Sequence, residues 1–222
     1  MQLDLALFDL DNTLLAGDSD YQWGQFLIEE GVLDRETHLA QTEQYYQDYK
    51  DGNLDIVAFL EFQLKPLADN SREQLDAWHR KYMERKIRPM MTDKARALVE
   101  KHRAHGDLLV VITATNSFVT APIAQAYGVE NLIGTDPEQV DGAYTGRVAG
   151  VPSFKEGKVT RLLAWLEARG QTMQSFGTTW FYSDSHNDLP LMKLVDHPVA
   201  VNADPILTEY AEANGWPLIS LR

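Results

Sequence analysis

Short apolar runs that end abruptly at polar residues are the feature of this sequence that most constrains its fold. Four of them have the length of buried strands, and they span residues 3–8, 108–112, 180–182 and 199–201. Stretches with helical periodicity lie between them, at residues 92–105, 117–127 and 158–168. The turn-forming pair Asp141-Gly142 adds a small hairpin over residues 140–148. Because strands that alternate with helices form parallel sheets, we expect an α/β fold with a Rossmann-like parallel sheet.

The segment between the first two of these runs follows a different pattern. It contains no convincing strand, and helical periodicity recurs over residues 21–30, 35–50, 54–64 and 71–86. We therefore expect an all-helical cap domain at residues 15–88. It would be inserted into an α/β core domain made of residues 1–14 and 89–222.

The chain is strongly acidic, with a formal charge of −13 and a pI near 4.8. Nucleic-acid binding depends on dense Lys and Arg contacts with phosphates, so we expect no nucleic-acid partner. The same charge repels small anions at long range. A phosphate site would need local positive charge from a metal, a lysine or backbone N–H groups.

Cysteine is absent from the 222 residues, which excludes disulfides, thiolate metal sites and a cysteine nucleophile. The first residues offer no basic region of the kind that begins a secretory signal, and two aspartates interrupt the first apolar stretch. No run approaches the ~18 apolar residues that a membrane span requires. We expect no membrane association and a cytoplasmic location.

Residues with a carboxylate or hydroxyl group that could take part in catalysis follow three of the predicted strands. Asp9 comes after the first run, Thr113 after the second and Asp184 after the third. In an open parallel sheet, ligands bind outside the carboxyl ends of the strands. These residues are remote in sequence, yet we expect them to converge in one crevice.

Paired carboxylates indicate a metal at this crevice. Asp9 and Asp11 are two residues apart, as are side chains that point the same way from a strand. At ~4 Å and an effective dielectric constant of about 20, two such charges repel by about 4 kcal/mol, so a cation is needed to keep both ionised. Asp184 and Asp188 add further negative charge. Hard oxygen ligands without a His or Cys pattern favour Mg²⁺ over zinc.

The order of these residues resembles the four motifs of the haloacid dehalogenase-like superfamily. The first motif is similar to Asp9-Leu10-Asp11-Asn12-Thr13, and the later ones to Thr113, Lys158 and Asp184-Ser185-His186-Asn187-Asp188. A single Asp-x-Asp-x-Thr is a weak signal, whereas four motifs in the expected strand and helix contexts are a strong one. A helical cap directly after the first motif resembles the phosphoserine phosphatase-like branch.

This resemblance implies a Mg²⁺-dependent phosphatase acting on a small organic phosphomonoester. Asp9 would be the nucleophile that forms an aspartyl-phosphate, and Asp11 the general acid and base. The phosphoryl oxygens would be held by Thr113, by nearby backbone N–H groups including that of Ala114, and by Lys158.

The resemblance also implies the ligands of the metal. Asp9, the main-chain carbonyl of Asp11, and Asp184 would bind Mg²⁺. Asp188 would contact it directly or through another ligand, with Asn187 in a supporting role. Because an alkoxide leaving group needs a proton and a halide does not, Asp11 favours phosphoryl transfer over dehalogenation.

Several assignments keep an alternative. Lys155 is a rival to Lys158, since both come shortly before the predicted helix, and Asp188 could simply cap the helix that begins near Pro190. Asp18 lies where phosphoserine phosphatases carry a glutamate that binds the substrate amine. It is either a contact for a cationic group on the substrate or a helix cap.

The branch resemblance favours substrates with an amino group, such as phosphoserine or histidinol phosphate. Thr113-Ala114-Thr115-Asn116 replaces the usual glycine-rich second motif, which makes phosphoserine itself the weaker choice. Two other functions remain open. One is a phosphotransferase or phosphomutase of the same superfamily. The other is a non-catalytic, metal-binding interaction module, which would not require Asp11, Thr113 and Lys158 together.

Overall fold

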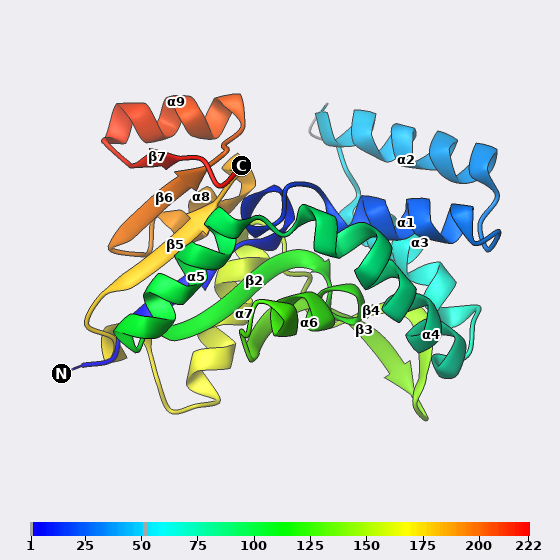
Figure 1. Cartoon of the computed structure of the whole chain (residues 1–222), viewed down its shortest axis with the longest axis horizontal. Helices are drawn as coiled ribbons and strands as arrows, with labels where there is room; N and C mark the ends of the chain where they lie inside the picture. Colours follow the sequence, from blue (N-terminus) through cyan, green and yellow to red (C-terminus); the bar gives the residue numbers. More distant parts are fainter. Residues whose placement is uncertain (1, 51–52) are drawn as a thin grey trace.

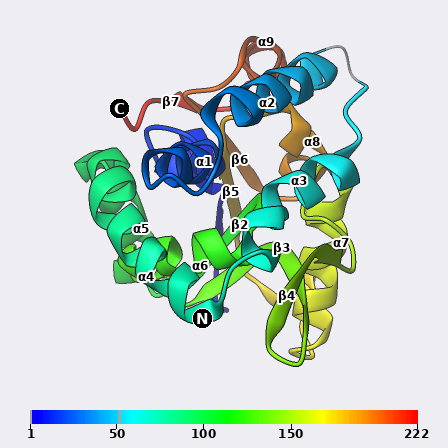
Figure 2. The same ribbon diagram turned by 90° about the vertical axis from the view of Figure 1, so that its right-hand side faces the viewer.

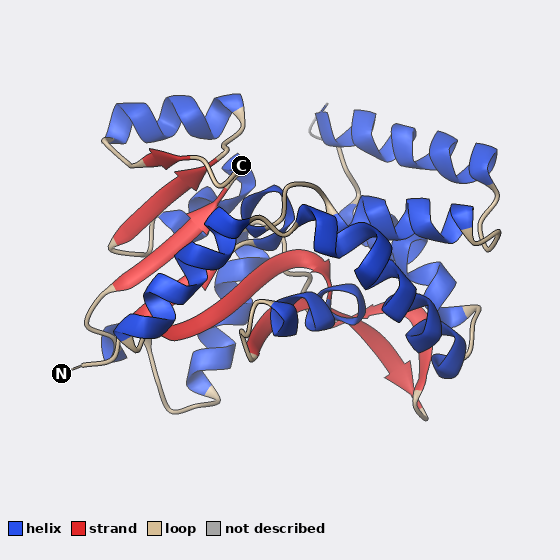
Figure 3. Ribbon diagram, in the orientation of Figure 1, coloured by secondary structure: helices blue, strands red, loops and turns tan. Residues whose placement is uncertain are grey.

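Seven strands form one sheet in the order β4-β3-β2-β1-β5-β6-β7, so that the first strand of the chain lies at its centre (Figure 1, Figure 3). The computed structural model describes residues 2–50 and 53–222, and of these residues 49 and 50 are described by their backbone alone. The strands are β1 Leu5–Phe8, β2 Leu108–Asn116, β3 Asn131–Val140, β4 Ala143–Ala149, β5 Thr179–Ser183, β6 His197–Val201 and β7 Leu218–Ile219. All neighbouring pairs are parallel except β3 and β4.

Helices connect these strands and cover both faces of the sheet. They are α1 Ser19–Glu29, α2 Arg35–Lys50, α3 Ile56–Ala68, α4 Arg72–Tyr82, α5 Asp93–His105, α6 Ser117–Ala126, α7 Glu156–Glu167, α8 Leu189–Met192 and α9 Pro205–Asn214. Shorter helical turns span Leu10–Leu14, Met83–Ile87, Arg88–Met90, Met173–Ser175 and His186–Asp188. The expected α/β fold with a mostly parallel sheet is confirmed.

Strand periodicity divides the core into two layers. On β1, Leu5 and Leu7 pack in one cluster with residues of α7, α8 and α9, whereas Ala6 and Phe8 pack in the other with residues of α5 and α6. All four β1 side chains have 0% exposure, as expected of a central strand covered by helices on both faces. In Figure 1, α5 and α6 lie in front of the sheet and α7 behind it. Burial on both faces explains why β1 is an uninterrupted apolar run.

Between β1 and α5 the chain forms helices α1 to α4, and no strand occurs among the described residues of this segment. These helices gather at the right-hand side of Figure 1, and Figure 2 views that side directly. Trp23 of α1 packs edge-on against Tyr82, with ring centroids 5.1 Å apart, and against Phe118 of α6 at 5.7 Å. This aromatic packing holds α1 against α6, which covers one face of the sheet. The domain boundaries at 14/15 and 88/89 stay a prediction.

Two expectations about local structure were incomplete. Strand β2 does not end near Thr113 but continues to Asn116, with a shift in its pairing register between Ile112 and Asn116. The expected hairpin at residues 140–148 is present, and Asp141 and Gly142 make its turn with positive φ angles of 51° and 82°. Its first strand, β3, is longer than expected because its start pairs with β2 inside the main sheet. Within the described part of the chain, no helix has the length and apolar character needed to cross a membrane.

Replacing Leu7 with alanine tests this two-layer core. Leu7 has 0% exposure, so Leu7→Ala should lower the free energy of unfolding by about 2–5 kcal/mol through lost burial and a residual cavity. The matched variant Leu3→Ala lies just before the strand at 43% exposure and should change it by less than about 0.5 kcal/mol. Urea denaturation followed by circular dichroism measures both. Equal losses would contradict the burial described for β1.

Candidate active site

Asp9 stands directly after β1, where the chain turns sharply. Its backbone N–H donates to the carbonyl of Tyr182 on β5 at 2.9 Å, so the residue is still tied to the neighbouring strand. The turn that follows is stabilised by buried Leu10 and Leu14 and includes Asn12 in the left-handed region, with φ of 56°. This positive φ suits asparagine better than most side chains. The turn presents the carboxylate of Asp9, which is only 6% exposed, at the carboxyl edge of the sheet.

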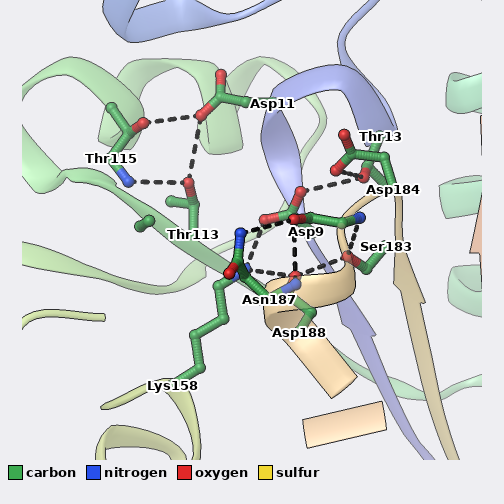
Figure 4. A network of polar contacts seen from close by, with 12 residues as sticks. Asp9, Asp11, Thr13, Thr113, Thr115, Lys158, Ser183, Asp184, Asn187 and Asp188 are labelled. Carbon is green, nitrogen blue, oxygen red and sulfur yellow. Dashed lines mark hydrogen bonds and ion pairs between the residues drawn. The ribbon is translucent and has the colours of Figure 1, made fainter. Parts of the chain in front are cut away.

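A hydroxyl and an ammonium group contact the two oxygens of Asp9 (Figure 4). Nζ of Lys158 donates to Oδ1 at 2.8 Å, and Oγ1 of Thr13 lies 3.0 Å from Oδ2. The same Thr13 hydroxyl is 3.2 Å from Oδ1 of Asp184. Because it carries one proton, it donates to one of these carboxylates at a time. Thr13 therefore links Asp9 to Asp184, which follows β5.

Lys158 comes from the first turn of α7 and is 3% exposed. Its Nζ lies between two carboxylates, 2.8 Å from Asp9 and 2.7 Å from Asp188. Burial alone would lower the pKa of this lysine, but the carboxylates of Asp188 and Asp9 raise it above its ordinary value. Ser183 donates to the same oxygen of Asp188 at 2.6 Å and helps to hold it in place.

Gly157 permits the close start of α7 that brings Lys158 into the crevice. A Cβ at this position would lie 2.0 Å from the carbonyl oxygen of Pro152, well inside van der Waals contact. Lys155, the rival candidate, is exposed and extends over the ring of Phe154, with Nζ 5.2 Å from its centroid. The structure thus brings Lys158, and not Lys155, against Asp9.

Asp11 has its own set of partners, separate from those of Asp9. Its Oδ2 accepts from Thr115 Oγ1 at 2.8 Å and from Thr113 Oγ1 at 3.4 Å, and its Oδ1 accepts the backbone N–H of Ser19 at 2.6 Å. Burial, followed by the nearby charge of Asp18, raises the pKa of Asp11 to about 6. A carboxyl group with this pKa can hold or release a proton near neutral pH.

The remaining candidate residues line the same cavity, which has a volume of about 650 Å³. Thr113 and Ala114 reach it from within β2 and not from a strand end, and Asn187 reaches it from the turn after β5. Asp18 also lines the cavity, and its Oδ1 accepts the backbone N–H of Tyr21 at 2.8 Å. Asp18 is thus the cap of α1, while a contact with substrate stays a prediction.

Negative charge at the carboxyl edge exceeds what Lys158 neutralises. The ammonium group of Lys158 pairs with Asp9 and Asp188, and Asp184 is joined to Asp9 through the hydroxyl of Thr13. Burial, and then the charges of Asp9 and Asp188, raises the pKa of Asp184 to about 9. Burial also raises the pKa of Asp9, against the opposing effect of Lys158. Such oxygen donors fit Mg²⁺, because a divalent cation would return these groups to their ionised form.

Another acidic group lies elsewhere and is held by internal contacts. Among the described residues, the ligand atoms of Asp4, His105 and Asp107 lie within 4.8 Å of one another, a closeness that the three carboxylates around Lys158 do not reach. Asp4 accepts the backbone N–H of Thr178 at 2.9 Å, and Asp107 pairs with His102 at 2.6 Å. Both aspartates lie at the amino ends of their strands, opposite Asp9. Their hydrogen bonds give them a structural role.

Sequence reasoning did not assign the hydroxyl groups that hold the carboxylates. Thr13 was part of the first motif without a role, while Thr115 and Ser183 were not singled out. Thr13 lies four residues from Asp9 and Ser183 five residues from Asp188, and this proximity was the available signal for those two contacts. Thr115 contacts Asp11 across 104 positions of sequence, a pairing that only the fold creates.

Known proteins share both the sequence and the fold. A family model described as haloacid dehalogenase-like hydrolase matches residues 6–193. A histidinol-phosphatase from Neisseria meningitidis serogroup C (strain 8013) is 50% identical over 99% of this chain and 99% of its own length.

Solved structures extend this comparison. A crystal structure of a protein with unknown function from Bordetella pertussis Tohama I has a TM-score of 0.95 at 48% identity, covering 100% of both chains. A substrate-bound phosphoserine phosphatase complex has a TM-score of 0.69 at 18% identity, covering 100% of this chain and 94% of that one. The second likeness concerns the fold alone.

Asp184→Asn tests the excess of buried charge. The pKa of Asp184 is raised from 3.8 to about 9. Between about pH 4 and pH 9, the folded state therefore keeps a proton that the unfolded state has already released. In the presence of a chelator, Asp184 makes the free energy of unfolding fall as pH rises through that window. Below about pH 4 both states are protonated, and the group has little effect on stability. Asp184→Asn should flatten this slope and abolish stabilisation by added Mg²⁺.

Thermal unfolding from pH 5 to 9, with chelator or with Mg²⁺, measures both effects. Asp69→Asn is the matched control, because Asp69 is an exposed partner of Lys65 and such surface ion pairs contribute little. A variant at Asp184 that keeps the wild-type pH slope and Mg²⁺ response would contradict the role of this carboxylate.

Proposed function

Because this chain belongs to the haloacid dehalogenase-like hydrolase family and is a phosphoric monoester hydrolase, we propose that its substrate is histidinol phosphate. Hydrolysis would yield histidinol and inorganic phosphate. The 50% identity to a histidinol-phosphatase over nearly the whole of both chains is the observation that carries this proposal. The position of Asp9, which lies beside Lys158 and lines a cavity of about 650 Å³, supports it.

In the first step, an oxygen of the Asp9 carboxylate attacks phosphorus and forms an aspartyl-phosphate. The bond between phosphorus and the ester oxygen breaks, and Asp11 in its protonated form gives its proton to the departing alkoxide. Lys158 and Thr113 line the cavity and would bind phosphoryl oxygens, and the backbone N–H groups near Ala114 would add further donors. The alcohol leaves with the proton that Asp11 held.

In the second step, Asp11 is ionised and accepts a proton from water, which attacks the same phosphorus atom. The bond between phosphorus and the Asp9 oxygen breaks, inorganic phosphate is released, and both aspartates return to their starting forms. A pKa of about 6 suits Asp11 to both steps, because neither form is strongly disfavoured near neutral pH. The hydrogen bonds from Thr115 and Ser19 hold the carboxyl group in place throughout.

We propose Mg²⁺ as the cofactor, held by Asp9, Asp184 and the main-chain carbonyl of Asp11, with Asp188 as a direct or indirect partner. When bound, the ion would neutralise negative charge, so that the Asp9 carboxylate can approach an anionic phosphate. Lys158, whose Nζ lies 2.8 Å from Oδ1 of Asp9, contributes positive charge to the same end. A cap domain at residues 15–88 would exclude water from the cavity during the first step. A cytoplasmic location stays a prediction.

Substitution of the two aspartates, assayed with two leaving groups, tests this mechanism. Asp9→Asn should abolish phosphate release, because it removes the attacking oxygen. Asp11→Asn should lower turnover of histidinol phosphate by about 10²- to 10⁴-fold. It should slow formation of the phospho-enzyme from an aryl phosphate much less, because a phenolate leaves without being protonated.

Phosphate release and rapid-quench measurement of the phospho-enzyme provide the readouts, with circular dichroism to check folding. Full activity in Asp9→Asn would overturn the assigned nucleophile. Isomerisation of a sugar phosphate without phosphate release would instead support a phosphomutase. Binding of Mg²⁺ without turnover of any phosphomonoester would support a non-catalytic module.

A further inference from the structure

A buried carboxylate of α1 lies in the cavity but takes no part in the phosphoryl-transfer steps. Asp20 is 9% exposed and lines the cavity together with Gln63 of α3. Its Oδ2 accepts a hydrogen bond from Nε2 of Gln63 at 2.7 Å. Within the part of the chain that the structure describes, no group donates to its Oδ1. Oδ1 is not among the fully buried, unpaired side-chain atoms of the described residues, so this oxygen is open to a ligand in the cavity that Asp20 lines.

The charges around Asp20 are all negative. Burial, and then the charges of Asp18 and Asp11, raise the pKa of Asp20 well above its ordinary value, which disfavours its ionised form. Among the described residues that line the cavity, Lys158 is the permanently cationic one, and it is engaged with Asp9 and Asp188. A cationic group that entered beside Asp20 would supply the missing counter-charge.

Asp18 is less suited to this role than Asp20. It is exposed, and its Oδ1 already accepts the backbone N–H of Tyr21 at the start of α1. Asp20 is instead held by a residue of another helix, because Gln63 belongs to α3, 43 residues along the chain. The Gln63 amide fixes one oxygen of Asp20 and leaves the other free to accept.

The part of the cavity wall contributed by α2 and α3 is largely apolar and aromatic. Tyr45 and Phe59 line the cavity with their rings edge to face, at a centroid separation of 5.4 Å. His38 also lines it and stacks on Phe62 at 4.9 Å, and burial lowers the pKa of His38, which favours its neutral form. A flat organic group that carries a positive charge could contact both the aromatic rings and the carboxylate of Asp20.

We propose that Asp20, held by Gln63, is a specificity residue that binds the ammonium group of the substrate, so that the enzyme prefers phosphomonoesters carrying a cation. This inference rests on the proposed function and extends it. The phosphate would be held by Lys158 and Thr113 at one end of the cavity and the cation by Asp20 at the other. Catalysis at phosphorus would not require Asp20, which contacts neither Asp9 nor Lys158 through any described hydrogen bond.

Asp20→Asn, assayed with two substrates that differ only in charge, tests the proposal. The substrates are histidinol phosphate and its analogue in which hydrogen replaces the amino group. The variant should lower kcat/KM for histidinol phosphate by about 10- to 100-fold, mainly through KM, since hydrogen bonds to charged groups are the stronger ones. For the amine-free analogue the change should stay below about threefold. Equal losses with both substrates would overturn the proposal.

Two further variants separate a specific contact from a general effect. Glu61→Gln is the matched control, because it removes one negative charge from an exposed position of α3 that does not line the cavity. It should leave both substrates unchanged. Gln63→Ala should reproduce the loss for histidinol phosphate in weaker form, because Asp20 would keep its charge but lose its fixed position. An unchanged substrate preference in Gln63→Ala would contradict the role of that amide.

Competition by histidinol distinguishes failure of this inference from failure of the proposed substrate. If the wild type hydrolyses an aryl phosphate in an Asp9-dependent manner but not histidinol phosphate, the proposed substrate is wrong. Histidinol then serves as a probe that carries the cation without a phosphate. Its inhibition constant against the aryl phosphate should rise by about 10- to 100-fold in Asp20→Asn. An inhibition constant that is the same in both proteins would overturn the inference.

Discussion

The ammonium group of Lys158 is the interaction on which the site depends. It lies 2.8 Å from Asp9 and 2.7 Å from Asp188, and all three side chains are almost entirely buried. Without it, the two carboxylates would repel each other in a region that solvates charge poorly. Removal of one partner from a buried ion pair typically costs about 3–5 kcal/mol, because a charge is then left without compensation. Lys158 therefore stabilises the fold at the same point where, in the proposed function, it would prepare Asp9 for an anionic substrate.

The sheet topology explains why this interaction can form. Asp9 follows β1, the central strand, and Asp184 and Asp188 follow β5, which pairs with β1 in parallel. Lys158 enters from α7, and the absence of a side chain at Gly157 lets that helix start against Pro152. Ligands of open α/β sheets bind at such carboxyl edges because the connecting turns there leave space and supply backbone donors.

The cavity separates two kinds of chemistry. In the proposed function, a phosphate binds Lys158 and hydroxyl donors at the sheet end. At the helical end, the carboxylates of Asp18 and Asp20 favour a positive charge. Asp11 lies between the two ends, with hydrogen bonds from Thr115 of β2 and from Ser19 of α1. A substrate with a phosphate at one end and an ammonium group at the other is complementary to both, and the acidic character of the whole chain does not oppose its approach.

The sequence by itself determined the elements and the chemical character of the site. Burial of β1 on both faces requires an uninterrupted apolar run, and the turns that follow β1 and β5 require polar residues, so Asp9 and Asp184 could be identified without coordinates. Local patterns did not define the end of β2, because the run from Leu108 continues past Thr113 through a register shift. Only the tertiary structure decided which lysine meets Asp9. Lys155 and Lys158 are alike in sequence context, but the first turn of α7 directs one into the crevice and the other to the surface. It also decided that Gln63 meets Asp20, because a contact across 43 residues depends on how two helices pack and leaves no local periodicity to detect.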